Sequence, residues 1–169
     1  DVVYSPDGSH IATAGADGLI KLWDATTGEQ VRTYEGVKEF VLEIGFSPDG
    51  TRLIGSSIHR ALLHTEIFVW DVESGERISI LGEIVGDAHG IAVHPTEPII
   101  AVSASEGRLK AWQIETGEEL FDVAVPGGGR LGQPDFSPDG NHIAISGLTA
   151  PVSILDAKTG AVVATLTDY

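Results

Sequence analysis

The sequence of 169 residues predicts an all-β fold, a β-propeller of four consecutive four-stranded antiparallel blades that form part of a larger ring. Two markers and the runs between them support this prediction. The prolines of a repeated turn motif are 42, 47 and 43 residues apart, at Pro6, Pro48, Pro95 and Pro138. The glycines of a second marker are 47, 42 and 43 residues apart, at Gly28, Gly75, Gly117 and Gly160. Short β-rich runs lie between the markers, and repeats of this length are typical of propellers.

The turn motif explains the first hairpin of each repeat. It is Ser-Pro-Asp-Gly at residues 5–8, 47–50 and 137–140, and a degenerate His-Pro-Thr-Glu at 94–97. Proline presets φ at the second position of a turn, Asp favours the third, and Gly accepts the positive φ that follows. We therefore assign a structural role to the closing glycines, which are Gly8, Gly50 and Gly140.

Reading outward from the two markers gives four strands in each repeat. In repeat two we expect strands at 42–46, 53–56, 67–70 and 78–81. One four-stranded sheet has too little area to bury both faces, so each sheet must stack on its neighbours. The predicted blades cover about 1–35, 36–82, 83–125 and 126–169.

Three tryptophans share one position, the end of the third strand, at Trp23, Trp70 and Trp112. Because large aromatic side chains dominate buried surfaces, we expect all three in the core or between blades.

The run at 11–24, together with the preceding turn, resembles a repeat of the WD-repeat β-propeller family. Its signature pair matches Trp23-Asp24 and Trp70-Asp71, whereas Trp112-Gln113 and Leu155-Asp156 each keep one half. The resemblance covers essentially the whole chain. It implies a closed ring of about six to eight blades in the family's architecture.

The family's repeats also carry a Gly-His pair and a polar network that links this His to a Ser, a turn Asp and the Trp. Here Asp17 matches the turn position, Glu106 replaces it in repeat three, and His64 falls there in repeat two. The residues at 36–37 are Gly-Val instead of Gly-His. We therefore expect the blades to depend more on apolar packing than on this network.

Composition narrows the classes of partner. The net charge of −15 is spread over all repeats and would repel phosphate backbones and anionic lipids, so we expect no nucleic acid and no membrane as partner. No apolar run approaches the length of about 18 residues that a membrane span needs. The lack of cysteine excludes disulfides and thiol catalysis but leaves the compartment open, with the cytoplasm slightly favoured.

The sequence offers no catalytic constellation. The Gly-rich stretch 127–132 formally fits a dinucleotide fingerprint, but a strand rather than a helix is expected after it. The histidine pairs His59/His64 and His89/His94 have no recognised metal-ligand geometry. We therefore expect no enzyme activity, no cofactor and no metal.

Irregular sequence is concentrated in loops that, in the family's architecture, share one rim of the ring. They include a five-residue insertion in repeat two around 58–64, the loops 83–89 and 126–130, and residues 38–40. Variable loops on a rigid scaffold are typical of a binding surface. The alternative for the insertion is a loop that covers a gap in weak packing. The candidate partner-binding residues are His59, Arg60, Leu62, Leu63, His64, Asp87, His89 and Arg130.

The resemblance therefore implies a non-catalytic scaffold with protein or peptide partners. The alternative is a regulatory or substrate-gating propeller of a larger multidomain enzyme or signalling NTPase whose catalytic domain is absent here. Four sheets leave two blade faces exposed. Three arrangements would cover these faces: the chain continues in a longer protein, a second copy associates with it, or the four blades close alone as a smaller propeller. We favour a longer chain, because the first residue already lies in a strand and the sequence has no Met.

Overall fold

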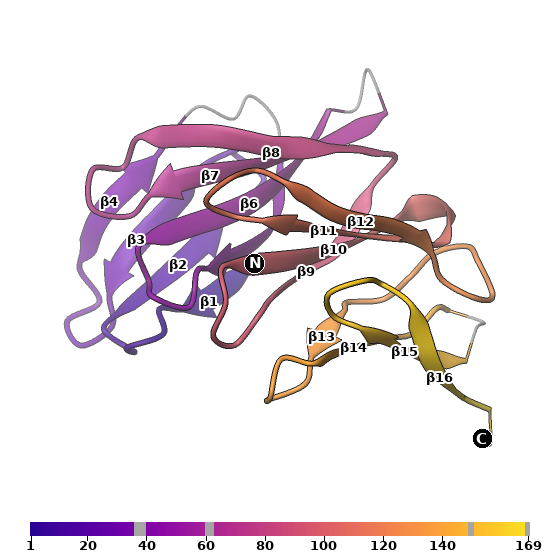
Figure 1. Cartoon of the computed structure of the whole chain (residues 1–169). Helices are drawn as coiled ribbons and strands as arrows, with labels where there is room; N and C mark the ends of the chain where they lie inside the picture. The colour runs from indigo at the N-terminus through magenta and orange to yellow at the C-terminus, as the bar shows by residue number, and fades with distance from the viewer. Residues whose placement is uncertain (36–39, 60–62, 149–150, 168–169) are drawn as a thin grey trace.

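The computed structural model describes residues 1–35, 40–59, 63–148 and 151–167. Four antiparallel sheets of four strands follow one another along the chain and fan out side by side, as expected (Figure 1). In each sheet the strands are hydrogen-bonded in sequence order, so consecutive strands are joined by hairpins without crossovers. The helical structure in these residues is a single 3-10 turn, η1 (Ser105–Gly107), and no helix there is long and apolar enough to cross a membrane.

The sheets have the following strands. The first contains β1 (Val2–Tyr4), β2 (His10–Ala14), β3 (Ile20–Asp24) and β4 (Gln30–Tyr34). The second contains β5 (Val41–Phe46), β6 (Arg52–His59), β7 (His64–Asp71) and β8 (Arg77–Val85). The third contains β9 (Ala88–Val93), β10 (Ile99–Ala104), β11 (Arg108–Gln113) and β12 (Glu119–Ala124). The fourth contains β13 (Asp135–Phe136), β14 (His142–Ile145), β15 (Val152–Asp156) and β16 (Val162–Leu166).

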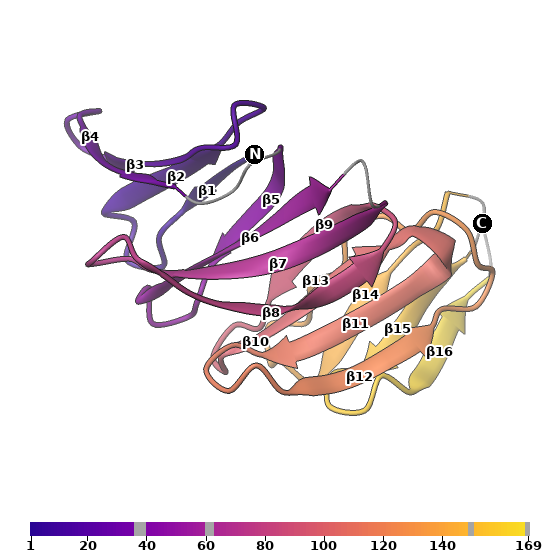
Figure 2. The same ribbon diagram turned by 90° about the horizontal axis from the view of Figure 1, so that it is seen from above.

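The first strand of each sheet packs beside the first strand of the next. These contacts join β1 to β5, β5 to β9 and β9 to β13. Viewed from above, the four sheets are arranged like blades around a common inner side, with β4, β8, β12 and β16 outermost (Figure 2). This is the arrangement of propeller blades in a partial ring, and we refer to the sheets as blades one to four.

Each pair of neighbouring blades encloses its own hydrophobic cluster. Leu53 and Phe68 pack with blade one, Val69 and Ile84 pack with blade three, and Phe136 belongs to the cluster between blades three and four. Alternate residues of a strand point to opposite faces, so a central blade contributes apolar side chains to two clusters. Blades one and four each have one face outside these clusters.

The repeated turns adopt the predicted geometry. In the first, Gly8 N–H donates to Ser5 C=O at 2.9 Å, and Gly8 has φ of +72°. Ser5 Oγ donates to Asp7 Oδ1 at 2.6 Å, so the side chains reinforce the turn. In the degenerate turn His94 replaces the serine. Its Nδ1 accepts the N–H of Glu97 at 2.8 Å, and the ring is only 6% exposed.

Repeat two differs from its predicted strands. The insertion around 58–64 is not simply a loop, because β6 and β7 stay paired up to His59 and His64. Strand β8 also extends to Val85 rather than ending at residue 81. The extension buries a cross-strand row of Ile58, Thr65 and Ile84. Burial of this row explains why the inserted residues lengthen the hairpin.

The three tryptophans are not equivalent. Trp70 and Trp112 are 0% and 1% exposed, and each lies in the cluster shared with the preceding blade. Trp23 is partly exposed, because none of the described blades packs on this face of blade one. Its Nε1 donates to Thr13 Oγ1 at 2.9 Å, so a part of the expected polar network is present in blade one. His64, expected at the turn position of this network, lies in β7 instead.

Candidate functional site

The blades present two different rims. The Ser-Pro-Asp-Gly turns form one of them. The loops between second and third strands, and those between blades, form the other, toward the right in Figure 1. The described residues among those predicted to bind a partner lie on this second rim, which we call the loop rim; they are His59, Leu63, His64, Asp87, His89 and Arg130. The other two predicted residues, Arg60 and Leu62, lie outside the described part of the chain.

Backbone contacts connect the loops of blades two and three. The end of the β6–β7 hairpin contacts the turn after β8, since Gly86 N–H donates to Leu63 C=O at 2.8 Å. Leu63 has φ of +54° and donates its N–H to His59 C=O, which closes the hairpin and leaves the Leu63 side chain 69% exposed. His59 and His64 are paired across the hairpin, and their rings stack with centroids 5.3 Å apart.

The contacts continue into blade three through Ser105. Its N–H donates to Asp87 C=O at 2.9 Å, and its Oγ lies 3.3 Å from Nε2 of His89. At the end of η1, Gly107 has φ of +72° and leaves no room for a side chain, because a Cβ would lie 2.7 Å from Gly128 Cα. The loop rim is therefore one continuous surface over blades two to four.

An open depression of about 420 Å³ lies between blades three and four on this rim. His89 of blade three lines it together with Arg130, Ser146 and Leu148, and Leu148 N–H donates to Arg130 C=O at 3.1 Å. Burial is the main cause of a lowered pKa of His89; the positive charge of Arg130 acts in the same direction, and Asp87 opposes it. A lowered pKa favours the neutral imidazole, so the depression combines a neutral ring with a guanidinium group.

Exposed hydrophobic side chains are concentrated on the loop rim. Among the described residues, the three most exposed large hydrophobic side chains are Leu148 at 79%, Val85 at 73% and Leu63 at 69%. All three lie in or beside loops of this rim. Leu63 was identified as a candidate from the sequence, but the other two were missed. Val85 lies in the candidate loop 83–89 but was not chosen from it, and Leu148 lies in a loop that has no insertion or unusual composition.

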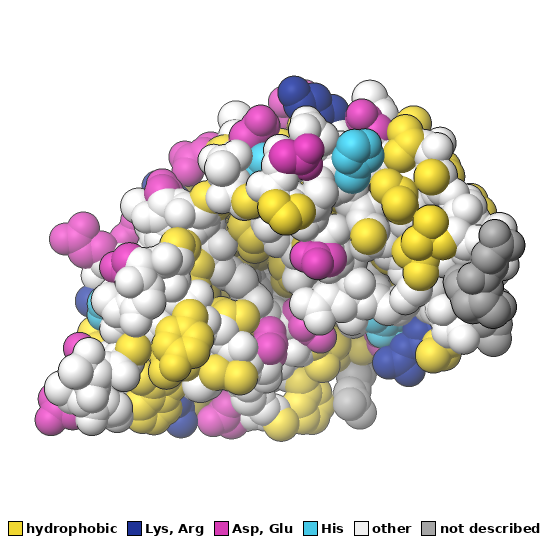
Figure 3. Space-filling view, turned by 90° about the horizontal axis from the view of Figure 1, so that it is seen from below, with side chains coloured by type: hydrophobic (Ala, Val, Ile, Leu, Met, Phe, Trp, Pro, Cys, Tyr) yellow, Lys and Arg dark blue, Asp and Glu magenta, His cyan; other side chains and the backbone are white. Residues whose placement is uncertain are grey.

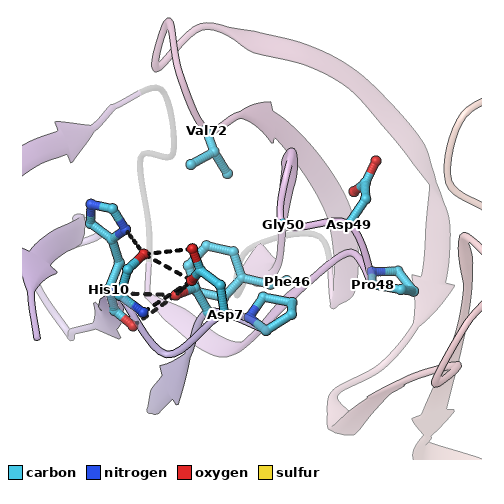
Figure 4. Close-up of a pocket in the computed structure, with 10 residues that line it drawn as sticks. Asp7, His10, Phe46, Pro48, Asp49, Gly50 and Val72 are labelled. Carbon is cyan, nitrogen blue, oxygen red and sulfur yellow. Dashed lines mark hydrogen bonds between the residues drawn. The ribbon is translucent and has the colours of Figure 1, made fainter.

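The opposite rim contains a groove that the sequence did not predict. It has a volume of about 470 Å³ and lies between the turns of blades one and two, with Pro6, Pro48 and Val72 in its lining (Figure 4).

Polar residues of this groove invite a catalytic interpretation that their geometry does not support. Ser9 Oγ lies 2.8 Å from Asp7 Oδ1 and 2.7 Å from Nδ1 of His10. In a hydrolytic triad the histidine stands between serine and carboxylate, whereas here the serine stands between the other two. Hydrogen bonds from Ser5 and Ser9 lower the pKa of Asp7 to about 2, so it is a turn-stabilising carboxylate.

The end faces of the blade series are also partly apolar. On blade one, Val2 and Tyr4 are 62% and 66% exposed, on the same face as Trp23. On blade four, Val163 and Leu166 of the outer strand are about half exposed. Figure 3 shows hydrophobic side chains gathered over the C-terminal blade at the right of the view.

Comparison with known proteins agrees with the repeat architecture. Residues 1–24 match the family model described as WD domain, G-beta repeat. The chain is 35% identical over 170 residues to WD repeat-containing protein 1-B of Xenopus laevis, an alignment that covers 96% of this chain and 27% of that protein.

Two further relatives come from other organisms. WD repeat-containing protein 1 of Bos taurus is 29% identical over 93% of this chain and 26% of its own length. Periodic tryptophan protein 2 homolog of Dictyostelium discoideum is 24% identical over 94% of this chain and 22% of its own length. The chain thus spans about a quarter of the length of the curated relatives it matches.

Proposed function

We propose that this chain, which belongs to the WD-repeat family, is part of a non-catalytic scaffold that binds proteins or peptides on its loop rim. The observation that carries the proposal is the position of Leu63, Val85 and Leu148, the three most exposed large hydrophobic side chains of the described residues. All three belong to one rim, together with the depression between His89 and Arg130. Apolar side chains that stay exposed together on one face of a folded protein are typical of interaction sites, and arginine is enriched among the residues that dominate binding energy.

The rigidity of the blades supports the same proposal. Backbone hydrogen bonds hold the loops together from Leu63 through Gly86 and from Asp87 through Ser105. A partner would therefore meet a surface that is largely formed before binding, which lowers the entropy lost on association. The predicted residues Arg60, Leu62 and His64 belong to the same proposed surface. The relatives named above give no support to the alternative of a regulatory propeller within an enzyme.

Selection of peptides tests the proposal without knowledge of the natural partner. We expect a random peptide library displayed on phage to yield ligands for the 169-residue chain. Replacement of Leu63, Val85 and Leu148 with Ser should weaken the binding of the selected peptides at least about tenfold, because full burial of a Leu or Val side chain is worth about 1.5–3 kcal/mol. Titration calorimetry with synthetic peptides measures the change.

The matched control replaces Val31 and Ile78, which are 50% and 51% exposed on the outer strands β4 and β8. Their replacement with Ser should leave peptide affinity unchanged. Ligands that lose affinity in this control but not in the loop-rim variant would contradict the proposal, because they would bind the outer edge of the blades instead.

We further propose that both end faces receive another blade, with blade boundaries near 1–35, 36–82, 83–125 and 126–169. Trp70 and Trp112 are each covered by the preceding blade, and Trp23 occupies the same repeat position without such cover. Light scattering after size exclusion tests this proposal on the 169-residue chain. A dimer or larger assembly that W23S weakens would support it. A monomer whose Trp23 fluorescence is unaffected by soluble quenchers would contradict it, because the face would then be closed within the chain.

A further inference from the structure

We infer that the extended hairpin of blade two holds a divalent transition-metal ion, with His64, Glu66 and Glu83 as its ligands. One ligand atom from each of these three residues lies within 4.8 Å of the other two. Ligands of a tetrahedral zinc ion bind at about 2.0–2.2 Å, so their donor atoms are about 3.4 Å apart. Small rotations of the glutamate side chains would therefore complete the site.

The strand register explains why these three side chains converge. His64 and Glu66 are two residues apart on β7, and successive side chains alternate, so both point to the same face. Glu66 is paired directly with Glu83 of the neighbouring strand β8. Directly opposed residues have Cβ atoms about 4.5–5.5 Å apart, which places the second carboxylate beside the first. The three ligands thus occupy adjacent positions on one rigid surface.

The charges of this surface favour a bound cation. Two carboxylates in directly opposed positions repel each other, and like charges in such a pair destabilise a sheet. Among the described residues, neither Glu66 nor Glu83 forms an ion pair with a lysine or arginine. By contrast, Asp122 in blade three is paired with both Arg108 and Lys110. A divalent ion between Glu66 and Glu83 would relieve this repulsion.

The ligand set selects the class of metal. Imidazole nitrogen is a good ligand for zinc, copper, iron and nickel, whereas calcium and magnesium prefer oxygen ligands alone. One histidine and two carboxylates would leave at least one coordination position for water or for a group from a partner. His59 acts as a positioning residue, because its ring stacks on the ring of His64 at an interplanar angle of 20°. The inserted residues of the hairpin would therefore help to bind the metal ion, in addition to their role in packing.

Titration of the metal-free 169-residue chain with zinc tests the inference without any protein partner, so the result is independent of the proposed scaffold function. We expect one zinc ion per chain by titration calorimetry. H64Q and E66Q keep the size of each side chain but remove or weaken a ligand. Each should lower zinc affinity at least about tenfold, since even changes around metal ligands cost 10–100-fold. Circular dichroism verifies that both variants keep the β fold.

The matched controls replace an exposed histidine and an exposed glutamate elsewhere. H142Q lies in blade four and E76Q lies at the other end of blade two, and both should bind zinc like the unchanged chain. Absence of saturable zinc binding would overturn the inference. Equal affinity in H64Q, E66Q and the controls would also overturn it, because the ion would then be attracted only by the general negative charge. A second measurement supports the assignment: zinc should raise the urea midpoint of the unchanged chain but not that of E66Q.

Discussion

Replacement of Trp70 with Ala tests the blade architecture most directly. Trp70 is fully buried, its ring lies 5.7 Å from that of Phe68, and its Nε1 donates to Glu35 C=O at 3.2 Å. An added Cβ at Gly55 would lie only 3.2 Å from the indole, so strand β6 packs tightly against the ring. Removal of the ring would leave a closed cavity between blades one and two. The expected loss of unfolding free energy is about 3–5 kcal/mol.

The matched variant is Trp23→Ala, at the same position of the preceding repeat. Trp23 is partly exposed and faces no preceding blade, so water fills the space that its removal leaves. With less apolar area lost and no closed cavity, we expect a cost of roughly 2 kcal/mol, about half that at Trp70. The difference between the two variants isolates the contribution of blade-to-blade packing, because the local strand position is the same.

Urea unfolding followed by far-ultraviolet circular dichroism measures both variants, since the β signal arises mainly from the backbone. The slope of the transition should stay the same if only the native packing changes. A near-neutral Trp70→Ala variant would refute the assignment of the tryptophan to a blade interface. The two variants are compared at protein concentrations at which light scattering shows a monomer. Equal costs at Trp23 and Trp70 would then refute the argument that no other blade covers the outer face of blade one.

Three further results are expected. Gly82→Val should lower the unfolding free energy by about 1–3 kcal/mol in the same assay, because a Cβ at this position would lie 2.9 Å from Nε1 of Trp112. His94→Ala should cost roughly 2–3 kcal/mol, because it removes a buried acceptor of two turn N–H groups and the contact of Nε2 with Gly140 C=O at 3.1 Å. The pKa of Asp7 is lowered from 3.8 to about 2 in the fold, so its stabilising contribution is complete above about pH 4 and is lost as the pH falls toward 2. The urea midpoint of Asp7→Asn should therefore fall less over this interval, and an unchanged pH profile would contradict the assigned role.

Much of the fold was predictable because the information is local and repeated. Proline, aspartate and glycine set the turns at 5–8, 47–50 and 137–140 through their own backbone preferences. Four occurrences of one pattern also reduce the ambiguity of any single occurrence. The degenerate turn at 94–97 was located by Pro95 and its spacing, although the role of His94 as an acceptor within the turn depends on the folded geometry.

The insertion in repeat two was located correctly but its form was not. Sequence spacing shows that residues are added, but a strand and a loop of this length have similar composition. Burial of Ile58 and Ile84 decides in favour of the extended hairpin, and Ile84 is buried in the cluster shared with blade three. The grouping of His64 with Glu83 has the same cause, because cross-strand register brings together residues that are 19 positions apart.

The rim that carries the irregular loops followed from the family resemblance, whereas the sequence by itself determined the repeat number, the turns and the four strands of each blade. Each of these depends on local backbone preference or on periodicity. Only the tertiary structure decided which tryptophans are buried, which hydrophobic side chains remain exposed on the loop rim, and which charged side chains converge. Those properties depend on neighbours that are distant in the chain, and a repeat motif is the same whether or not a preceding blade covers it.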